Sequence, residues 1–175
     1  MSDELLRRCQ HGDEAALALL VAEYQERIFR LACRVTGDAA LAEEATAQAL
    51  LKIWTRARQW QGGASAATWI YRLAVRTVLD VQRGQRRWWR RWGNGLRLNE
   101  KQRPAAANDA ADRVHAAVQQ LNEADRALVH LYYFEEKSLA EIEGVLGVPR
   151  DNLKMRLARA RQRLKPLLEE PDAHG

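Results

Sequence analysis

The fold is decided by residues 138–164, SLAEIEGVLGVPRDNLKMRLARARQRL. Ser138 and Glu141 have the spacing of a capping box, in which each side chain accepts a hydrogen bond from a free N–H at the start of a helix. A helix is therefore expected to begin at Leu139. It is expected to end at Gly147, because glycine tolerates the left-handed backbone that stops a helix.

A second helix is predicted after this turn, with Asp151 or Asn152 as its cap. Its apolar residues recur every three or four positions, the period of a helix that buries one face. These residues are Leu153, Leu157, Ala160, Leu164 and Leu168. Two helices joined by a tight turn that contains glycine form a helix-turn-helix.

The opposite face of the second helix carries the side chains with binding chemistry. At about 100° per residue, the positions that point away from the leucines are Asp151, Met155, Ala158, Arg159 and Gln162, with Lys154 at one border. The cations that flank the leucines are Arg156, Arg161, Arg163 and Lys165. A helix fits the DNA major groove, where outward side chains contact bases and flanking cations contact phosphates. The alternative is a solvated basic helix in a bundle.

Length and composition favour an all-α protein made of two small helical domains. The chain has 175 residues, with only 4 prolines and 10 glycines among long segments rich in Ala, Leu, Arg and Glu. The formal net charge of +5 indicates a polyanionic partner. Bases dominate residues 83–103 and 150–165, so two separate contacts with that partner are expected.

The sequence predicts a cytoplasmic protein without a cofactor or a metal. Its first residues, MSDELLRRCQHGDEAA, are polar, and no apolar run approaches the roughly 20 residues of a membrane span. Cys9 and Cys33 are the only cysteines, so reduced thiols are expected, with Cys33 in the core. Cys9 and His11 have the ligand types of half a metal site, but no second pair follows at ligand spacing. No nucleophile with a base and no phosphate loop occurs, so the chain is expected not to be an enzyme.

Four helices are predicted in the N-terminal part from apolar periodicity and capping residues. They run from after Ser2 to near Gly12, from Asp13 to Gly37, from Asp38 through Trp54, and from about Ala66 to Arg83 or beyond. The segment from Arg58 to Ser65, RQWQGGAS, loses the helical period and contains a Gly-Gly pair. It predicts a flexible loop in which Trp60 has little reason to be buried.

An unusual arginine and tryptophan cluster follows the fourth helix, with Trp88, Trp89 and Trp92 among arginines. Arginine with tryptophan suits nucleic acid and suits a protein groove equally well, so both interpretations stay open. The expected organisation is an N-terminal helical domain, a flexible linker, and a C-terminal helix-turn-helix domain. Their expected ranges are 1–92, 93–108 and 109–175.

Three segments in this order resemble the extracytoplasmic-function (ECF) class of the sigma-70 family of RNA polymerase sigma factors. Residues 41–54, LAEEATAQALLKIW, are similar to the family's AEDLVQEVFLRLW, and residues 68–80, TWIYRLAVRTVLD, to its TWLYRIAxN. Residues 121–164 are similar to LPxxxRxxxxLxxxEGxSYxEIAxxLGxxxGTVKSRLxRARxxL. A helix-turn-helix alone is weak evidence, since many unrelated regulators carry one, whereas three ordered segments are specific.

The resemblance implies a transcription initiation factor that binds core RNA polymerase, directs it to promoter DNA and helps to melt the minus-ten element. The residues that would contact the polymerase are Glu43, Glu44, Ala47, Gln48, Leu51 and Trp54. Those that would contact the minus-ten element are Arg58, Trp60, Gln61, Trp69, Tyr71, Arg72 and Arg76. Those that would contact the minus-thirty-five element are Arg150, Asn152, Lys154, Met155, Arg156, Ala158, Arg159 and Arg161.

The resemblance also implies that the loop around Trp60 receives a base flipped out of the minus-ten element. Unstacking a base costs a few kcal/mol, and stacking on an aromatic side chain returns about 1 to 3 kcal/mol of it. For Trp69, a position in the protein core is at least as good an interpretation as a contact with DNA.

The chain departs from the family pattern at positions that bear on binding. Ala47 and Gln48 stand where the family usually has Gln and Glu, and Arg76 replaces a common Asn. Met155 and Ala158 cannot form bidentate contacts with bases. Lys154 and Arg159 are therefore expected to supply most of the specificity, at about 1 to 3 kcal/mol each.

The family further implies an anti-sigma factor, often membrane-bound, that holds the two domains in a closed arrangement, and no small-molecule substrate. One alternative is an autonomous helix-turn-helix regulator that binds specific DNA tightly without polymerase. Another is a protein-binding adaptor, whose basic zones are only solvated faces. The adaptor predicts no salt-dependent affinity for DNA, whereas a phosphate-contacting face loses affinity as salt rises.

Overall fold

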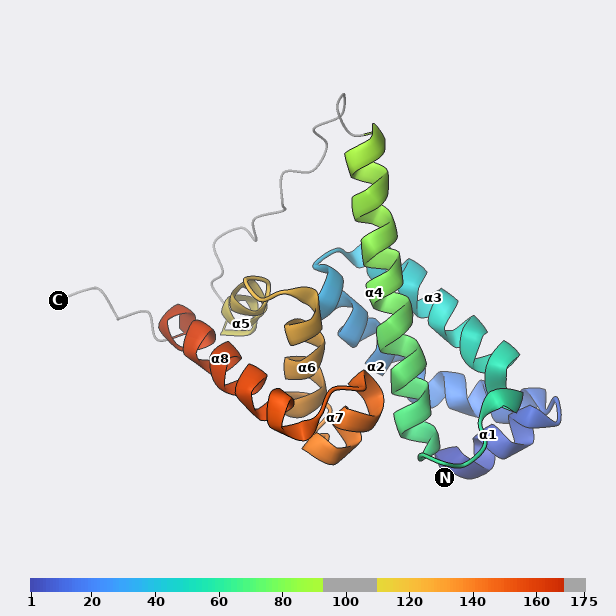
Figure 1. Cartoon of the computed structure of the whole chain (residues 1–175). Coiled ribbons are helices and arrows are strands. Elements are labelled where there is room, and N and C mark those ends of the chain that lie inside the picture. Colours follow the sequence, from blue (N-terminus) through green and yellow to red (C-terminus); the bar gives the residue numbers. More distant parts are fainter. Residues whose placement is uncertain (93–109, 169–175) are drawn as a thin grey trace.

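The structure is a computed structural model that describes residues 1–92 and 110–168 (Figure 1). Within these residues every regular element is a helix, as the composition predicts. The elements are α1 (Ser2–Gln10), α2 (Glu14–Thr36), α3 (Ala39–Arg56), the 3-10 turn η1 (Ala57–Gln59), α4 (Ala66–Trp92), α5 (Ala110–Val118), α6 (Glu123–Tyr133), α7 (Leu139–Leu146) and α8 (Arg150–Leu168). The predicted linker, residues 93–108, lies outside the described residues.

Capping residues fix the helix ends in the N-terminal half as the sequence predicts. The Asp13 carboxylate accepts a hydrogen bond from the Ala16 N–H at the start of α2, and Asp38 accepts one from the Leu41 N–H at the start of α3. Gly37 ends α2 with a φ of 69°, in the left-handed region that glycine tolerates. The direction of the chain therefore changes between α2 and α3 where local chemistry dictates it.

The helix-turn-helix has the predicted boundaries at its first helix and turn. Ser138 and Glu141 form the capping box at the start of α7, and Gly147 ends it with a φ of 68°. α8 packs on the other helices with Leu153, Leu157, Ala160 and Leu164, all of which are buried.

Two details of the second helix differ from the prediction. α8 begins at Arg150, so neither Asp151 nor Asn152 is its cap; both lie in its first turn, where the carboxylate of Asp151 still complements the helix dipole. The first backbone bond runs from the Leu153 N–H to the Pro149 carbonyl, which brings the start of the helix forward. Leu168 is 43% exposed and lines an open hollow together with Val114 and Val118 of α5.

The N-terminal half is a bundle in which α2 packs on α3 and α3 on α4, with α1 across their ends (Figure 1). Its largest buried side chains include Tyr24, Ile28, Leu31 and Ile70. In the C-terminal half, α5, α6 and α7 pack against α8. The apolar helix faces that periodicity predicts thus form the core of each half.

The two halves also pack against each other, through α4 with α7 and α2 with α6 (Figure 1). Their buried apolar residues form one continuous cluster. One close approach is at Gly144 of α7, where an added Cβ would lie 2.9 Å from Cγ2 of Thr68 in α4. Gly144 is therefore a packing residue that allows the first helix of the helix-turn-helix to lie directly on α4.

Candidate nucleic-acid interface

The outward face of α8 is open to solvent, as the helical period predicts. Asp151, Met155, Ala158, Arg159 and Gln162 are all exposed, and so is Lys154. The Lys154 amine lies 3.6 Å from Asp151, and both side chains are exposed. A surface pair of this kind contributes about 0 to 1 kcal/mol, so Lys154 is free to exchange its partner for DNA.

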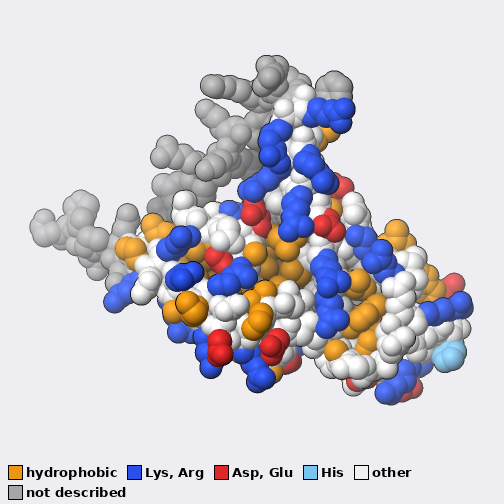
Figure 2. Space-filling model, in the orientation of Figure 1, with side chains coloured by type: hydrophobic (Ala, Val, Ile, Leu, Met, Phe, Trp, Pro, Cys, Tyr) orange, Lys and Arg blue, Asp and Glu red, His pale blue; other side chains and the backbone are white. Residues whose placement is uncertain are grey.

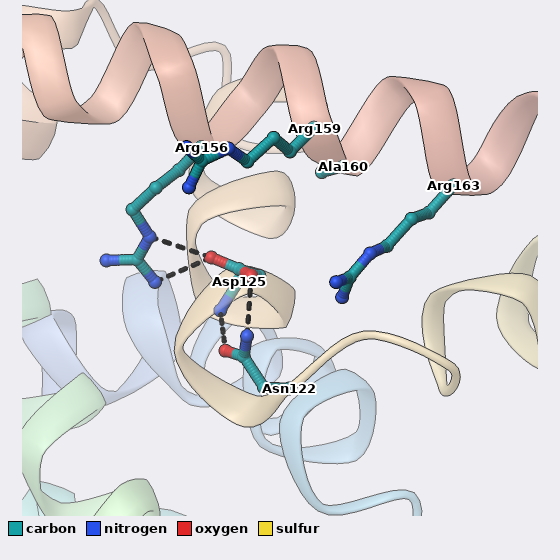
Figure 3. Close-up of a pocket in the computed structure, with 6 residues that line it drawn as sticks. All are labelled: Asn122, Asp125, Arg156, Arg159, Ala160 and Arg163. Carbon is teal, nitrogen blue, oxygen red and sulfur yellow. Dashed lines mark hydrogen bonds and ion pairs between the residues drawn. The ribbon is translucent and has the colours of Figure 1, made fainter.

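Arg156 has a partner within the protein. Its Nε and Nη2 atoms lie 2.8 and 2.6 Å from Oδ1 of Asp125 in α6 (Figure 3). Asn122, the cap of α6, donates a hydrogen bond to the same carboxylate. This pair links α8 to the start of α6. It also neutralises much of the positive charge of Arg156, which the sequence analysis expected to contact DNA.

Beside this pair lies a hollow of about 370 Å³ between α8 and the start of α6 (Figure 3). It is lined by Asn122, Asp125, Arg156, Arg159, Ala160 and Arg163. Three guanidinium groups against one carboxylate leave an excess of positive charge there. The hollow thus suits an anionic group such as a phosphate.

The other two predicted arginines of this helix-turn-helix also have protein partners. Arg150 lies 2.9 Å from Glu143 in an exposed pair. Arg161 donates a hydrogen bond to the Tyr133 hydroxyl, and its guanidinium lies 5.9 Å from the centre of that ring. Asn152 is exposed on the first turn. Figure 2 shows the Lys and Arg side chains gathered over α8 and in a line along α4.

The predicted polymerase-binding residues share one face of α3. Glu43, Glu44 and Ala47 are exposed, and Leu51 is 62% exposed, which is unusual for so large an apolar side chain. Gln48 donates a hydrogen bond to Glu44 at 2.9 Å, and Trp54 is half-buried against the core. The face therefore combines an exposed leucine with carboxylates.

Trp60 is buried, so the expectation that it has little reason to be buried is wrong. Its side chain is 5% exposed, and its Nε1 donates a hydrogen bond to the Ala64 carbonyl at 2.8 Å. Gln10 of α1 donates to the Trp60 carbonyl, and the Arg7 guanidinium lies 5.7 Å from the ring centre. Trp60 is buried because α1, which is distant in sequence, packs against the loop.

The rest of this loop is at the surface. Arg58 and Gln61 are exposed, and Nε of Arg58 donates to the Gln10 carbonyl at 3.2 Å. Gly62, which follows, has a φ of 77°. The structure thus leaves Arg58 and Gln61 accessible while it removes the indole between them from solvent.

The predicted minus-ten residues of α4 are divided between solvent and the C-terminal half. Arg76 is exposed and Trp69 is half-buried, as a core position for Trp69 requires. Tyr71 is fully buried, and Nε of Arg72 donates a hydrogen bond to the Gly144 carbonyl of α7 at 2.8 Å. Arg72 therefore faces α7, and Tyr71 faces the segment between α6 and α7, where its hydroxyl bonds to Glu135.

Sequence reasoning missed the polar cluster between the halves. Glu135 accepts hydrogen bonds from Nε and Nη2 of Arg27 at 2.9 and 2.6 Å, and another from the Tyr71 hydroxyl. Nε2 of His130 lies 3.5 Å from the same carboxylate. Arg27 and Glu135 are 108 residues apart, so no local pattern announces their contact.

Burial and these partners shift the ionisation of the cluster. Burial alone raises the pKa of Glu135, but His130, Tyr71 and Arg27 outweigh it and bring the pKa to about 2. Burial lowers the pKa of His130, with the Arg34 charge acting in the same direction. Burial and the Glu135 carboxylate raise the pKa of Tyr71. Near neutral pH the cluster therefore holds an ionised Glu135 between a charged Arg27 and neutral His130 and Tyr71.

Within residues 1–92 and 110–168, no three His, Cys, Asp or Glu side chains form a group that could hold a metal ion. None of the helices in these ranges is long and apolar enough to cross a membrane. Cys9 is buried and Cys33 is half-buried, both as free thiols.

Comparison with known proteins gives two family matches. Residues 20–88 match sigma-70 region 2, and residues 111–164 match sigma-70 region 4. The RNA polymerase sigma-H factor of Pseudomonas aeruginosa is 31% identical over 95% of this chain and 95% of its own length. The ECF RNA polymerase sigma factor SigL of Mycobacterium tuberculosis is 31% identical over 94% of this chain and 97% of its own.

Two solved structures have the same fold. CnrH in complex with the cytosolic domain of CnrY matches with a TM-score of 0.72 and 18% identity, over 97% of this chain and 98% of that one. The sigma factor RpoE of Bartonella quintana, in complex with the anti-sigma factor NepR, matches with a TM-score of 0.73 and 18% identity, over 87% of this chain and 96% of that one.

Proposed function

Because the chain belongs to the ECF class of the sigma-70 family of RNA polymerase sigma factors, we propose that its two halves bind core RNA polymerase and the two elements of a promoter. Members of this family are transcription initiation factors. The observation that carries the proposal is the exposed face of α8, which lies opposite the buried Leu153, Leu157 and Leu164.

In this proposal α8 enters the major groove of the minus-thirty-five element. Lys154 and Arg159 contact base edges, at about 1 to 3 kcal/mol of discrimination each, and Met155 packs on a thymine methyl group. Arg163, which lines the hollow beside the start of α6, binds a backbone phosphate. Arg156 positions α8 through Asp125 and has only a minor share in binding DNA.

The exposed face of α3 is the proposed contact with the polymerase. Leu51 supplies apolar area, and Glu43, Glu44 and Ala47 lie on the same side of the helix in the turns before it. Apolar side chains with a polar rim are typical of protein interfaces. Gln48 and Trp54, on the same helix, are half-buried.

The minus-ten contact is assigned to the exposed part of the loop and of α4. Arg58, Gln61 and Arg76 are accessible without any rearrangement. Trp60, Tyr71 and Arg72 reach DNA only after local or interdomain movement, because each is held by protein partners. Melting of the promoter therefore requires a different conformation of this chain.

The proposed domains are residues 1–92 and 109–175, joined by residues 93–108. A linker that matches the spacing of two sites raises the effective concentration of the second contact, so two modest contacts become one strong one.

We place the protein in the cytoplasm with the polymerase. An anti-sigma factor is a further proposed partner, and a membrane-bound one would hold the protein at the inner membrane.

The test is run-off transcription from a pool of genomic fragments with purified core polymerase, with and without the protein. Discrete transcripts that appear only when it is added support the proposal, and their sequences give both promoter elements. Arg159→Ala is expected to reduce these transcripts, whereas Gln162→Ala, on the same exposed face, serves as the control. Tight binding of specific DNA by the protein alone, without new transcripts, would instead establish an autonomous regulator.

A further inference from the structure

The C-terminal end of α4, residues 83–92, has no part in the proposed contacts with polymerase and promoter. In Figure 1 the last turns of α4 extend beyond α3 and beyond the helices of the C-terminal half. The sequence of this end, RGQRRWWRRW, contains five arginines, three tryptophans and no acidic residue. We call residues 83–92 the Arg/Trp end.

The helical period separates the two residue types of the Arg/Trp end. At about 100° per residue, the arginine positions fall within an arc of about 140° on one side of α4, and the tryptophan positions fall within about 100° on the other side. The arginine positions are 83, 86, 87, 90 and 91, and the tryptophan positions are 88, 89 and 92. The end of α4 is therefore an amphipathic helix whose charged side is entirely cationic.

The arginine side of this end is exposed to solvent at all five positions. Arg83 lies 3.5 Å from Asp80, and Arg86 forms an ion pair with Glu123 at the start of α6. Two carboxylates against five guanidinium groups leave an excess of three positive charges. This side therefore attracts a surface that carries many negative charges.

The tryptophan side contributes an exposed indole. The Trp88 side chain is 51% exposed, and it lines an open hollow of about 360 Å³ together with Leu41 of α3 and Val81 of α4. Glu44 and Asp80 line the same hollow, and burial of their carboxylates in an apolar medium would be costly. The indole can therefore enter a polar interface, but this end of α4 cannot go deep into an apolar layer.

Only one class of partner uses both sides of such a helix at once. Duplex DNA would use the arginine side alone, because base stacking requires aromatic and basic side chains in one groove. A protein groove would take the tryptophan side and leave the arginines in solvent. At a membrane surface, tryptophans lie at the level of the headgroups, and long arginine side chains extend to the lipid phosphates.

We propose that the Arg/Trp end of α4 binds the surface of a membrane that contains anionic phospholipid. Trp88 lies among the headgroups, and Arg87, Arg90 and Arg91 contact lipid phosphates. Each arginine near an anionic surface strengthens binding by about fivefold. The inference goes beyond the proposed function and does not depend on it, since this contact requires neither polymerase nor promoter DNA. It also requires no membrane-bound partner protein.

The first experiment is co-sedimentation of the full-length protein with lipid vesicles. One set of vesicles contains phosphatidylglycerol and phosphatidylethanolamine, and the other contains phosphatidylcholine alone. We expect binding to the anionic vesicles that weakens as salt rises, and binding to the phosphatidylcholine vesicles that is at least about tenfold weaker. No binding to the anionic vesicles at low salt would overturn the proposal.

The second experiment separates the Arg/Trp end from the net charge of the protein. The test variant replaces three exposed arginines of this end with glutamine, at Arg87, Arg90 and Arg91. The matched control replaces three exposed arginines of α8 with glutamine, at Arg150, Arg159 and Arg163. We expect the test variant to bind anionic vesicles at least about tenfold more weakly and the control to change by less than about threefold. Equal losses in the two variants would overturn the proposal.

The third experiment distinguishes a membrane from DNA through the indole. Trp88→Ala is expected to weaken vesicle binding by about fivefold, because the interfacial side chain is lost. Met155→Ala, which truncates an apolar side chain of α8 that is 55% exposed, is the control and is expected to have little effect. The same proteins are titrated with duplex DNA of unrelated sequence. Normal vesicle binding by Trp88→Ala, together with weaker duplex binding by the arginine variant, would assign this end to DNA and overturn the proposal.

Discussion

The two helices with proposed DNA contacts, α8 and α4, differ in what covers the proposed contact residues. The outward face of α8 meets only solvent, and its charged side chains have at most exposed partners on the same surface. On α4, by contrast, Tyr71 is buried and Arg72 is bonded to α7. Two basic helices thus present different surfaces: the outward face of α8 is exposed, and part of α4 is covered by the C-terminal half. The difference arises from packing between halves, and it makes α8 the part of the free protein that is ready to meet DNA.

The largest expected effect tests the orientation of the open helix. Leu157→Ala removes a buried side chain beneath the exposed face of α8, and we expect it to lower the free energy of unfolding by about 2 to 5 kcal/mol. Met155→Ala, on the exposed side, is expected to change it by less than about 0.5 kcal/mol. Chemical denaturation of both variants checks this, and equal effects would mean that α8 is turned differently.

A smaller effect is expected for recognition by the same helix. Arg159→Ala is expected to weaken binding of the minus-thirty-five element by about 1 to 3 kcal/mol, because one contact with a base edge is lost. Affinity for core polymerase is expected to stay unchanged. Loss of polymerase binding in a direct titration would refute the assignment.

The groups that cover α4 predict a dependence of stability on pH. The folded pKa of His130 is lowered from 6.5, so the unfolded chain binds the proton more readily and stability falls as the pH drops below about 6.5. The pKa of Glu135 is lowered from 4.5 to about 2, so its contribution is complete above 4.5 and is lost as the pH falls toward 2.

Denaturation midpoints across this range are therefore expected to fall steadily on acidification. Glu135→Gln is expected to make the fall below 4.5 shallower, and Asp13 and Glu141, whose pKa values are also lowered, account for the rest of it. Loss of the Glu135 charge also removes an interaction that raises the pKa of His130, so the fall below 6.5 is retained. A midpoint that does not change with pH in the unmodified protein would contradict the buried, paired state of Glu135 and His130.

The smallest effect concerns the backbone next to Glu135. Glu136 is the one residue other than glycine with a positive φ, 49°, among residues 1–92 and 110–168. The family pattern has glycine at this position. Glu136→Gly is expected to raise the free energy of unfolding by about 1 kcal/mol, since glycine adopts this conformation without the Cβ penalty. Glu136→Ala retains that penalty, so a similar gain in both variants would count against backbone strain.

Local chemistry explains what the sequence could predict. The capping box at Ser138, the glycine stop at Gly147 and the leucine stripe of α8 act over a few residues, and all three have the predicted form. The exposed face of α8 follows from that stripe by helical geometry. The predicted cap at Asp151 was wrong because Pro149 already supplies the carbonyl for the first bond of the helix.

Contacts between distant segments explain what the sequence could not predict. Trp60 is buried by α1, some 50 residues earlier in the chain, as the bond from Gln10 to its carbonyl shows. The bond between Arg27 and Glu135 spans 108 residues. The composition of a loop or the period of a helix contains no information about such partners. The covered state of α4 therefore became visible only in the folded chain.

The most direct test of an open α8 and a covered α4 is hydroxyl-radical footprinting of tyrosines, read by mass spectrometry. Tyr133, which is exposed beside α8, is the internal reference, and Tyr71 reports on the contact between the halves. In the free protein we expect Tyr133 to be modified much faster than Tyr71, and addition of core polymerase to increase modification of Tyr71. Modification of Tyr71 as fast as that of Tyr133 in the free protein would contradict the account.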